Sequence, residues 1–171
     1  MIPDPTMLWV AGGAAGLLAA FTLAGLALDL AVTGEAARQV VANLNARVRS
    51  WWVMVAVFGA ALLLGQGAII GLFAMLSFLA LREFVSLTPT RAGDRVPLFL
   101  AFFVVVPLQY GLVGTGCVGL FAILIPVYVF LTLPALSALG ADTTDYLARN
   151  AKLQWGLLLT VYCLSHAPAL L

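Results

Sequence analysis

The chain has 171 residues, of which 64% are hydrophobic and only 9% are charged, and its mean hydropathy is +1.12. An ordinary soluble domain has about a quarter charged residues, so this composition excludes a soluble protein and predicts an all-α integral membrane protein. The net charge of +1 indicates little about partners, and no nucleic-acid partner is expected.

The first two apolar stretches predict three membrane spans. Residues 1–6 lack the basic segment of a signal peptide, so Met7 to Leu28 is expected to be a retained span. Trp51 to Leu81 would be about 46 Å long as one helix, whereas the hydrocarbon core is about 30 Å thick. We expect the run to break at Gly65-Gln66-Gly67, where two glycines flank its one strongly polar residue.

The same arithmetic divides the second half of the chain. Val96 to Ser137 would reach about 60 Å as one helix. Gln109 to Gly111 and Gly114 to Gly116 are predicted to supply a turn between Pro107 and Val118. Leu153 to Leu171 is the last predicted span, which gives about six transmembrane helices with short outer turns.

The basic residues support this topology. With six spans, Thr33 to Ser50, Arg82 to Arg95 and Ala138 to Lys152 all emerge on one side of the membrane. The positive-inside rule makes that side the cytoplasm and puts both termini outside. These three segments contain every basic residue of the chain: Arg38, Arg47, Arg49, Arg82, Arg91, Arg95, Arg149 and Lys152.

The first cytoplasmic segment is predicted to be an amphipathic helix, because Val40, Leu44 and Val48 are spaced four residues apart, with Ala37 and Val41 alongside them. It leads to Trp51 and Trp52, which are typical interfacial anchors. A connector on the lipid surface is favoured over a substrate-recruiting arm. Residues 1–50 are therefore interpreted as the first transmembrane helix plus this connector, and residues 51–171 as a helical membrane bundle.

Two aspartates in the third segment allow two interpretations. Asp142 and Asp145 are three residues apart, and two such carboxylates are weak candidates for holding a divalent metal ion. The favoured alternative is a helix start, with Asp142 as N-cap and the helix running through Tyr146 into the last span.

Other candidate chemistry is sparse. Cys117 and Cys163 are isolated in apolar stretches and are expected to be packing residues. His166, the one histidine, is expected to be packed or interfacial. Asp29 is expected to face a bundle interior, a watery cleft or the nearby interface.

Arg82 and Glu83 are adjacent where the second apolar run, Trp51 to Leu81, ends. On a helix they are about 100° apart, so they do not pair with each other and are free to take different partners. One interpretation is that Arg82 reaches the lipid headgroups while Glu83 is solvated.

Several stretches resemble a known family. "SFLALREFVSLTP", preceded by "RSWWVMVAVFGAALLLG" and followed by "PLQYGLVG" and "QWGLLLTVYCLSHAPALL", is similar in order and spacing to the N-terminal half of bacterial phosphatidate cytidylyltransferases, the CDP-diacylglycerol synthases. The resemblance covers most of the chain from Arg49 to Leu171. The C-terminal block that holds the family's catalytic metal ions has no counterpart here.

The resemblance implies a multi-pass protein of the inner (plasma) membrane that acts on CTP and the membrane lipid phosphatidate. Its Mg²⁺ ligands are expected in the missing C-terminal part, so the chain alone is expected to be inactive, as a truncated chain or one part of a split protein. A C-terminal half or a second copy are possible partners. Catalytic residues are not assigned.

The residues implied to lie near the lipid phosphate or the nucleotide are Arg82, Glu83, Arg91 and Arg95, with Arg38, Arg47 and Arg49 as second choices. The alternative function is a non-enzymatic helical membrane scaffold or partner subunit.

Overall fold

The computed structural model describes residues 5–139 and 144–170, and all of its regular elements in these ranges are helical. Five helices are long and apolar enough to cross a membrane. They are Gly12–Ala31, Glu35–Leu64, Gln66–Ser86, Arg95–Thr115 and Val118–Leu139. The prediction of an all-helical fold with several helices of membrane length is thereby confirmed. The last expected span is helical as far as Ala169, but it is not among these five helices, so the number six stays a prediction.

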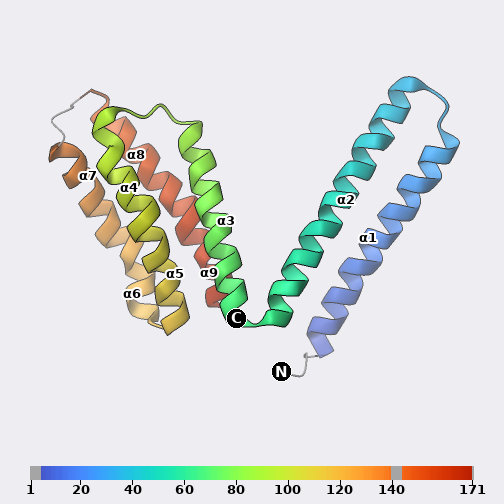
Figure 1. The fold of residues 1–171 in the computed structure, drawn as a ribbon, viewed down its shortest axis with the longest axis horizontal. Coiled ribbons are helices and arrows are strands. Elements are labelled where there is room, and N and C mark those ends of the chain that lie inside the picture. Colours follow the sequence, from blue (N-terminus) through green and yellow to red (C-terminus); the bar gives the residue numbers. More distant parts are fainter. Residues whose placement is uncertain (1–4, 140–143, 171) are drawn as a thin grey trace. The chain divides into compact units, whose positions relative to one another are not determined.

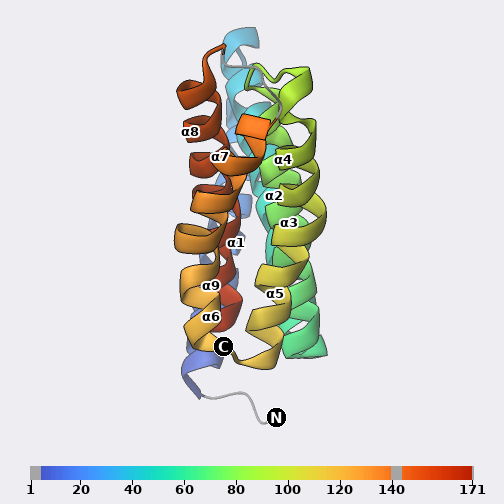
Figure 2. The same cartoon turned by 90° about the vertical axis from the view of Figure 1, so that its left-hand side faces the viewer.

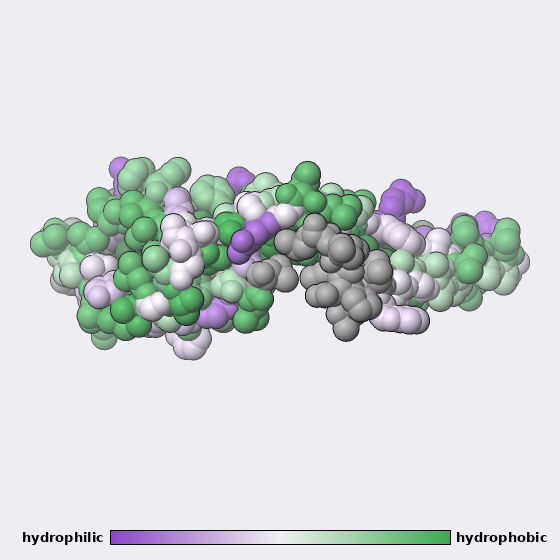
Figure 3. All heavy atoms as spheres, turned by 90° about the horizontal axis from the view of Figure 1, so that it is seen from below, coloured by the Kyte–Doolittle hydropathy of each residue, from purple (hydrophilic) through white to green (hydrophobic). Residues whose placement is uncertain are grey.

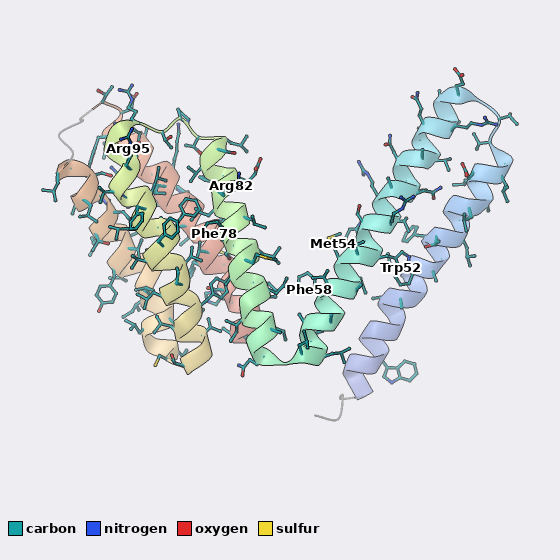
Figure 4. The ribbon with its side chains drawn as sticks, viewed as in Figure 1. Trp52, Met54, Phe58, Phe78, Arg82 and Arg95 are labelled. Atoms are coloured by element: carbon teal, nitrogen blue, oxygen red, sulfur yellow. The ribbon has the colours of Figure 1, made fainter. Side chains whose placement is uncertain are left out.

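The chain divides into two compact units, Met1–Ala60 and Ala61–Leu171 (Figure 1). The first unit is an antiparallel hairpin of α1 (Pro5–Ala31) and α2 (Glu35–Leu64) up to Ala60. A Cβ atom added to Gly25 would clash with the Asn45 side chain, so this glycine lets the two helices approach closely. Trp52 points toward α1 (Figure 4), and its Nε1 donates a hydrogen bond of 3.1 Å to Thr22 Oγ1.

The hairpin corrects one prediction for the first cytoplasmic segment. Of the residues predicted to lie on the apolar face, Val41 and Val48 are buried, whereas Val40 is 68% exposed. The face that contacts α1 is the one with Val41 and Val48, together with Trp52, which bonds to Thr22. The segment also continues without a break into the next span as the single helix α2.

The break expected at Gly65 is confirmed. Helix α2 ends at Leu64, α3 (Gln66–Ser86) begins at Gln66, and Gly65 between them has φ of 97°. A residue with a side chain is strained at this φ, so glycine is required at the break.

The second unit consists of four antiparallel helical rods (Figures 1 and 2). The first rod is α3. The second rod is α4 (Arg95–Leu100), η2 (Ala101–Val105) and α5 (Val106–Thr115). The third is α6 (Val118–Ile123), η3 (Leu124–Val129) and α7 (Phe130–Leu139). The fourth is α8 (Tyr146–Leu157), η4 (Leu158–Cys163) and α9 (Leu164–Ala169). The three η segments are π-helical turns inside otherwise α-helical rods.

The core between the rods is apolar. Leu81, Ala101, Ile125, Leu157 and Val161 are completely buried, and together they come from all four rods. Large hydrophobic side chains are also exposed on the rods, among them Phe99, Phe103, Leu131 and Leu159, and Figure 3 shows many hydrophobic residues on the face seen from below. A hydrophobic exterior suits contact with lipid chains.

The second predicted turn is confirmed at Gly116, which has φ of 69° and lies between α5 and α6. The prediction that Gln109 to Gly111 contribute to this turn is wrong, because these residues lie inside α5. Gln109 is buried, and its Nε2 donates hydrogen bonds to Ser165 Oγ at 3.1 Å and Phe121 O at 3.3 Å. Tyr110 shares a 2.6 Å hydrogen bond with Ser77. The Gln109 amide nitrogen and the Tyr110 hydroxyl, which suggested a turn, are therefore bonded across the bundle, whereas Gln109 Oε1 is buried without a partner among the described residues.

Prolines in the third rod fix its register against the fourth. A proline has no N–H to donate to the carbonyl four residues earlier. For Pro126 that carbonyl belongs to Ala122, which accepts a 3.1 Å hydrogen bond from Tyr162 Oη. For Pro134 it belongs to Phe130, which accepts a 2.9 Å hydrogen bond from Gln154 Nε2. Both donors come from the fourth rod. Its side chains therefore replace the backbone hydrogen bonds that the prolines of the third rod cannot donate.

We predict that Gln154→Leu destabilises the protein by about 1 kcal/mol, because it leaves the Phe130 carbonyl without a donor in an apolar environment. In a Pro134→Ala background the restored N–H can serve that carbonyl, so the same substitution should cost less. The measurement is loss of helical circular dichroism with increasing SDS in mixed micelles. Gln66→Leu, at an exposed glutamine of α3, is the matched control. Equal costs of Gln154→Leu in both backgrounds would contradict this role.

Candidate functional site

A buried ion pair joins two loop regions at one end of the second unit. Asp94 follows the loop after α3, in the short helix η1 (Ala92–Asp94), and Arg149 lies in the first turn of α8. Arg149 Nε is 3.0 Å from Asp94 Oδ1, and the two side chains are 7% and 10% exposed respectively. Charges removed from water to this degree need good geometry and further hydrogen bonds.

Those further hydrogen bonds are present. The backbone N–H of Arg91 donates to Asp94 Oδ2 at 2.9 Å, so both carboxylate oxygens accept a hydrogen bond. The guanidinium of Arg149 also donates from Nη1 to the carbonyl of Thr144 at 2.8 Å. The pair therefore fixes the loop before α4 and the start of α8 against each other.

A pocket lies beside the ion pair. Its polar wall includes Arg149, Asn150 and Lys152 of α8, which bring two positive charges to a site that also holds the carboxylate of Asp94. The complete lining is Phe84, Val85, Thr88, Pro89, Thr90, Asp94, Leu98, Ser137, Arg149, Asn150, Lys152 and Leu153.

The four sequence-predicted binding residues lie at the same end of the unit as this pocket but do not line it. Arg82 and Glu83 are exposed near the end of α3, and Arg91 and Arg95 are exposed on either side of Asp94. Figure 4 shows Arg82 and Arg95 toward the ends of α3 and α4 that the 87–94 loop connects. We call this end, with its residues Arg82, Arg91, Arg95, Arg149 and Lys152, the basic end.

The predicted helix start in the third segment is corrected. Helix α8 begins at Tyr146 with Asp145 as its N-cap, and the Asp145 side chain makes no capping hydrogen bond. Asp145 has φ of 51°, a conformation that aspartate tolerates better than most residues. Asp142, the expected N-cap, lies outside the described residues. Within residues 5–139 and 144–170 no three His, Cys, Asp or Glu side chains gather as a metal site.

The remaining candidates lie away from the pocket. His166 packs against the rings of Phe121 and Tyr162, with ring centroids 4.8 and 4.6 Å away. Cys117 and Cys163, which were expected to be packing residues, are both exposed, so that expectation is wrong. Asp29 is exposed near the end of α1.

Sequence reasoning missed Asp94, Arg149, Asn150 and Lys152 as a group, although one signal pointed to Arg149. Arg149, Leu153, Leu157 and Val161 are spaced four residues apart, and the three apolar ones are buried. A charge in register with a buried apolar stripe is itself expected to be buried and to need a partner. The identity of that partner depends on tertiary structure.

Residues 45–171 match the family model described as "Cytidylyltransferase family", which covers both loops of the ion pair and the whole pocket. The chain belongs to the cytidylyltransferase family. It is also 34% identical over 125 residues to the uncharacterized protein YnbB of Escherichia coli strain K12. That match covers 73% of this chain and 40% of YnbB, so the chain spans less than half the length of this relative. No solved structure is significantly similar to it.

We predict that Asp94→Asn destabilises the protein by about 3 kcal/mol, because the positive charge of Arg149 is then buried without a counter-charge. Thermal unfolding in detergent, followed by circular dichroism, measures the effect. Asp29→Asn, at an exposed aspartate, is the control and should change stability by less than about 0.5 kcal/mol. A similar, small effect of both substitutions would contradict the structural importance of the pair.

Proposed function

We propose that this chain forms the N-terminal membrane part of an enzyme that transfers a cytidylyl group from CTP to phosphatidate. An oxygen of the phosphatidate phosphate attacks the α-phosphorus of CTP, and the bond from that phosphorus to the bridging oxygen of the β-phosphate breaks. Pyrophosphate leaves and CDP-diacylglycerol is formed, so the reaction belongs to phospholipid biosynthesis.

The match to the cytidylyltransferase family over residues 45–171 carries this proposal. The fold supports it, since a bundle of membrane-length helices can hold a lipid substrate while its end faces a water-soluble nucleotide. In the second unit all the basic residues lie at or near the basic end, where such a meeting of lipid and nucleotide would take place. By the positive-inside rule we assign this end to the cytoplasm.

The contribution of this chain is to bind the substrates and to neutralise the negative charge of their phosphate groups. Phosphoryl transfer depends mostly on positioning the reactants and stabilising charge on the transferred group. Exposed Arg82, Arg91 and Arg95 can approach phosphate oxygens from the rim, and Glu83 can orient a neighbouring cation. Mg²⁺, when bound, would neutralise the polyphosphate. We place its ligands in a part of the enzyme beyond this chain.

The experiment is incorporation of labelled CTP into lipid, with phosphatidate and Mg²⁺ in micelles. The 171-residue chain alone is expected to be inactive, and a protein that continues through a C-terminal catalytic part is expected to turn over. Failure of that longer protein would overturn the proposal and favour the alternative, a non-enzymatic membrane scaffold or partner subunit.

Within the longer protein, we predict that Arg82→Ala lowers turnover at least about tenfold, because a positive charge near the substrate phosphates is lost. The comparison is made at equal expression and equal thermal stability. Arg38→Ala, on the first unit, is expected to have the smaller effect. Unchanged turnover of the Arg82 variant would assign Arg82 to lipid headgroup contact only.

A further inference from the structure

Phenylalanine rings from the first two rods of the second unit form a cluster at the surface. The ring of Phe78, on α3, has its centroid 5.1 Å from that of Phe102 and 6.4 Å from that of Phe103. The ring centroids of Phe99 and Phe103 are 5.0 Å apart. Phe99 and Phe103 are 59% and 61% exposed, and large apolar rings favour a surrounding that is not water. We call these four residues the aromatic cluster, which suits contact with lipid chains.

Two arginines of the basic end lie next to the aromatic cluster. Arg82 is four residues after Phe78 on α3, and Arg95 is four residues before Phe99 on the second rod. Side chains at this spacing are neighbours on one face of a helix, so each arginine shares a face with a ring of the cluster. Both arginines are exposed (Figure 4), and neither makes a salt bridge within the part of the chain that the structure describes.

The neighbouring acidic residues in the sequence do not neutralise these two charges. Asp94 precedes Arg95, but its carboxylate is paired with Arg149. Glu83 follows Arg82, but it is turned about 100° around α3. The surface therefore presents two positive charges beside exposed aromatic rings. Its complement is a molecule that joins a negative group to a long apolar chain.

A membrane phospholipid has this combination. Arginine side chains cover apolar surface with their stems while the guanidinium reaches the charged headgroups. Four residues, about 6 Å along a helix, separate each arginine from its ring. The rings are therefore at the depth of the acyl chains when the arginines are at the headgroups. We propose that Arg82, Arg95 and the aromatic cluster bind one anionic phospholipid of the surrounding bilayer, with an acyl chain against the exposed rings.

The charge of the lipid follows from the two arginines. A zwitterionic headgroup brings a positive group of its own, which the arginines repel, whereas a headgroup such as phosphatidylglycerol carries only the negative phosphodiester. The proposal goes beyond the proposed function, because the bound lipid belongs to the bulk membrane and does not react. It requires neither turnover nor a part of the enzyme beyond this chain.

The experiment uses one fluorine label beside the proposed acyl chain. Trifluoromethyl-phenylalanine replaces Phe103 in the 171-residue protein, which is placed in phosphatidylcholine nanodiscs. The ¹⁹F NMR signal is followed as phosphatidylglycerol replaces phosphatidylcholine. The same label in place of Leu131 is the matched control. Leu131 is 70% exposed and lies eight residues before the end of its rod at Leu139, whereas Phe103 lies eight residues after the start of its rod at Arg95.

We expect the label at Phe103 to reach half of its full change at about 4% phosphatidylglycerol. Each arginine near an anionic headgroup contributes about a fivefold preference, which gives about 25-fold for the two. The label at Leu131 should change only in proportion to the lipid composition. Arg82→Gln and Arg95→Gln should each lower the preference about fivefold, and Arg47→Gln, at an exposed arginine of the first unit, should change it by less than about twofold.

A change at Phe103 that is only proportional to composition, or equal effects of the three arginine substitutions, would overturn the proposal. A half-change with phosphatidate at a level at least about tenfold lower than with phosphatidylglycerol would also overturn it, because the surface would then select the substrate lipid.

The same titration on the longer protein tests whether a protein segment occupies this surface instead. Loss of the saturable change there would show that the C-terminal part covers the aromatic cluster, and the lipid assignment would be overturned. Turnover is scored separately. A saturable change without turnover would remove the proposed function and keep the lipid site, and turnover without the change would do the reverse.

Discussion

The buried ion pair between Asp94 and Arg149 is the interaction on which the arrangement of the second unit depends. It holds the loop after α3 and the start of α8 at the same end of the bundle. The second and third rods, which lie between them in the chain, must therefore run antiparallel to each other. The same pair forms one side of the pocket and brings Asn150 and Lys152 to it. A buried pair is weak evidence for net stability, but it strongly disfavours any arrangement that separates its partners.

Away from the basic end, the relative positions of the rods are set by polar groups whose hydrogen-bond partners lie on a different rod. Gln154 and Tyr162 serve the carbonyls that Pro134 and Pro126 leave without a donor, and both pairs join the third rod to the fourth. Gln109 joins the second rod to both of them through Phe121 and Ser165. In an apolar surrounding a shift of one rod would leave these groups unpaired. Apolar contacts hold the rods together, but they set the register of the rods less strictly than these hydrogen bonds do.

The sequence predicted the features that depend on local chemistry. Membrane character followed from composition, the breaks at Gly65 and Gly116 followed from chain length and glycine, and the shared end of two basic segments followed from the placement of arginines. It did not predict features set by distant partners. Gln109 suggested a turn because its partners, Phe121 and Ser165, are 12 and 56 residues away. Asp94 looked like one more charge in a polar loop, because Arg149, 55 residues later, makes it part of a site.

The most direct test of this account is the coupling between Asp94 and Arg149 in a double-mutant cycle. The free energy of unfolding is measured in detergent for the unchanged protein, Asp94→Asn, Arg149→Gln and the double variant. The account predicts that the double variant loses at least about 1 kcal/mol less stability than the sum of the two single variants, because each single change leaves one buried group uncompensated. Additive losses would show that the two residues do not act as a pair and would contradict the arrangement built on them.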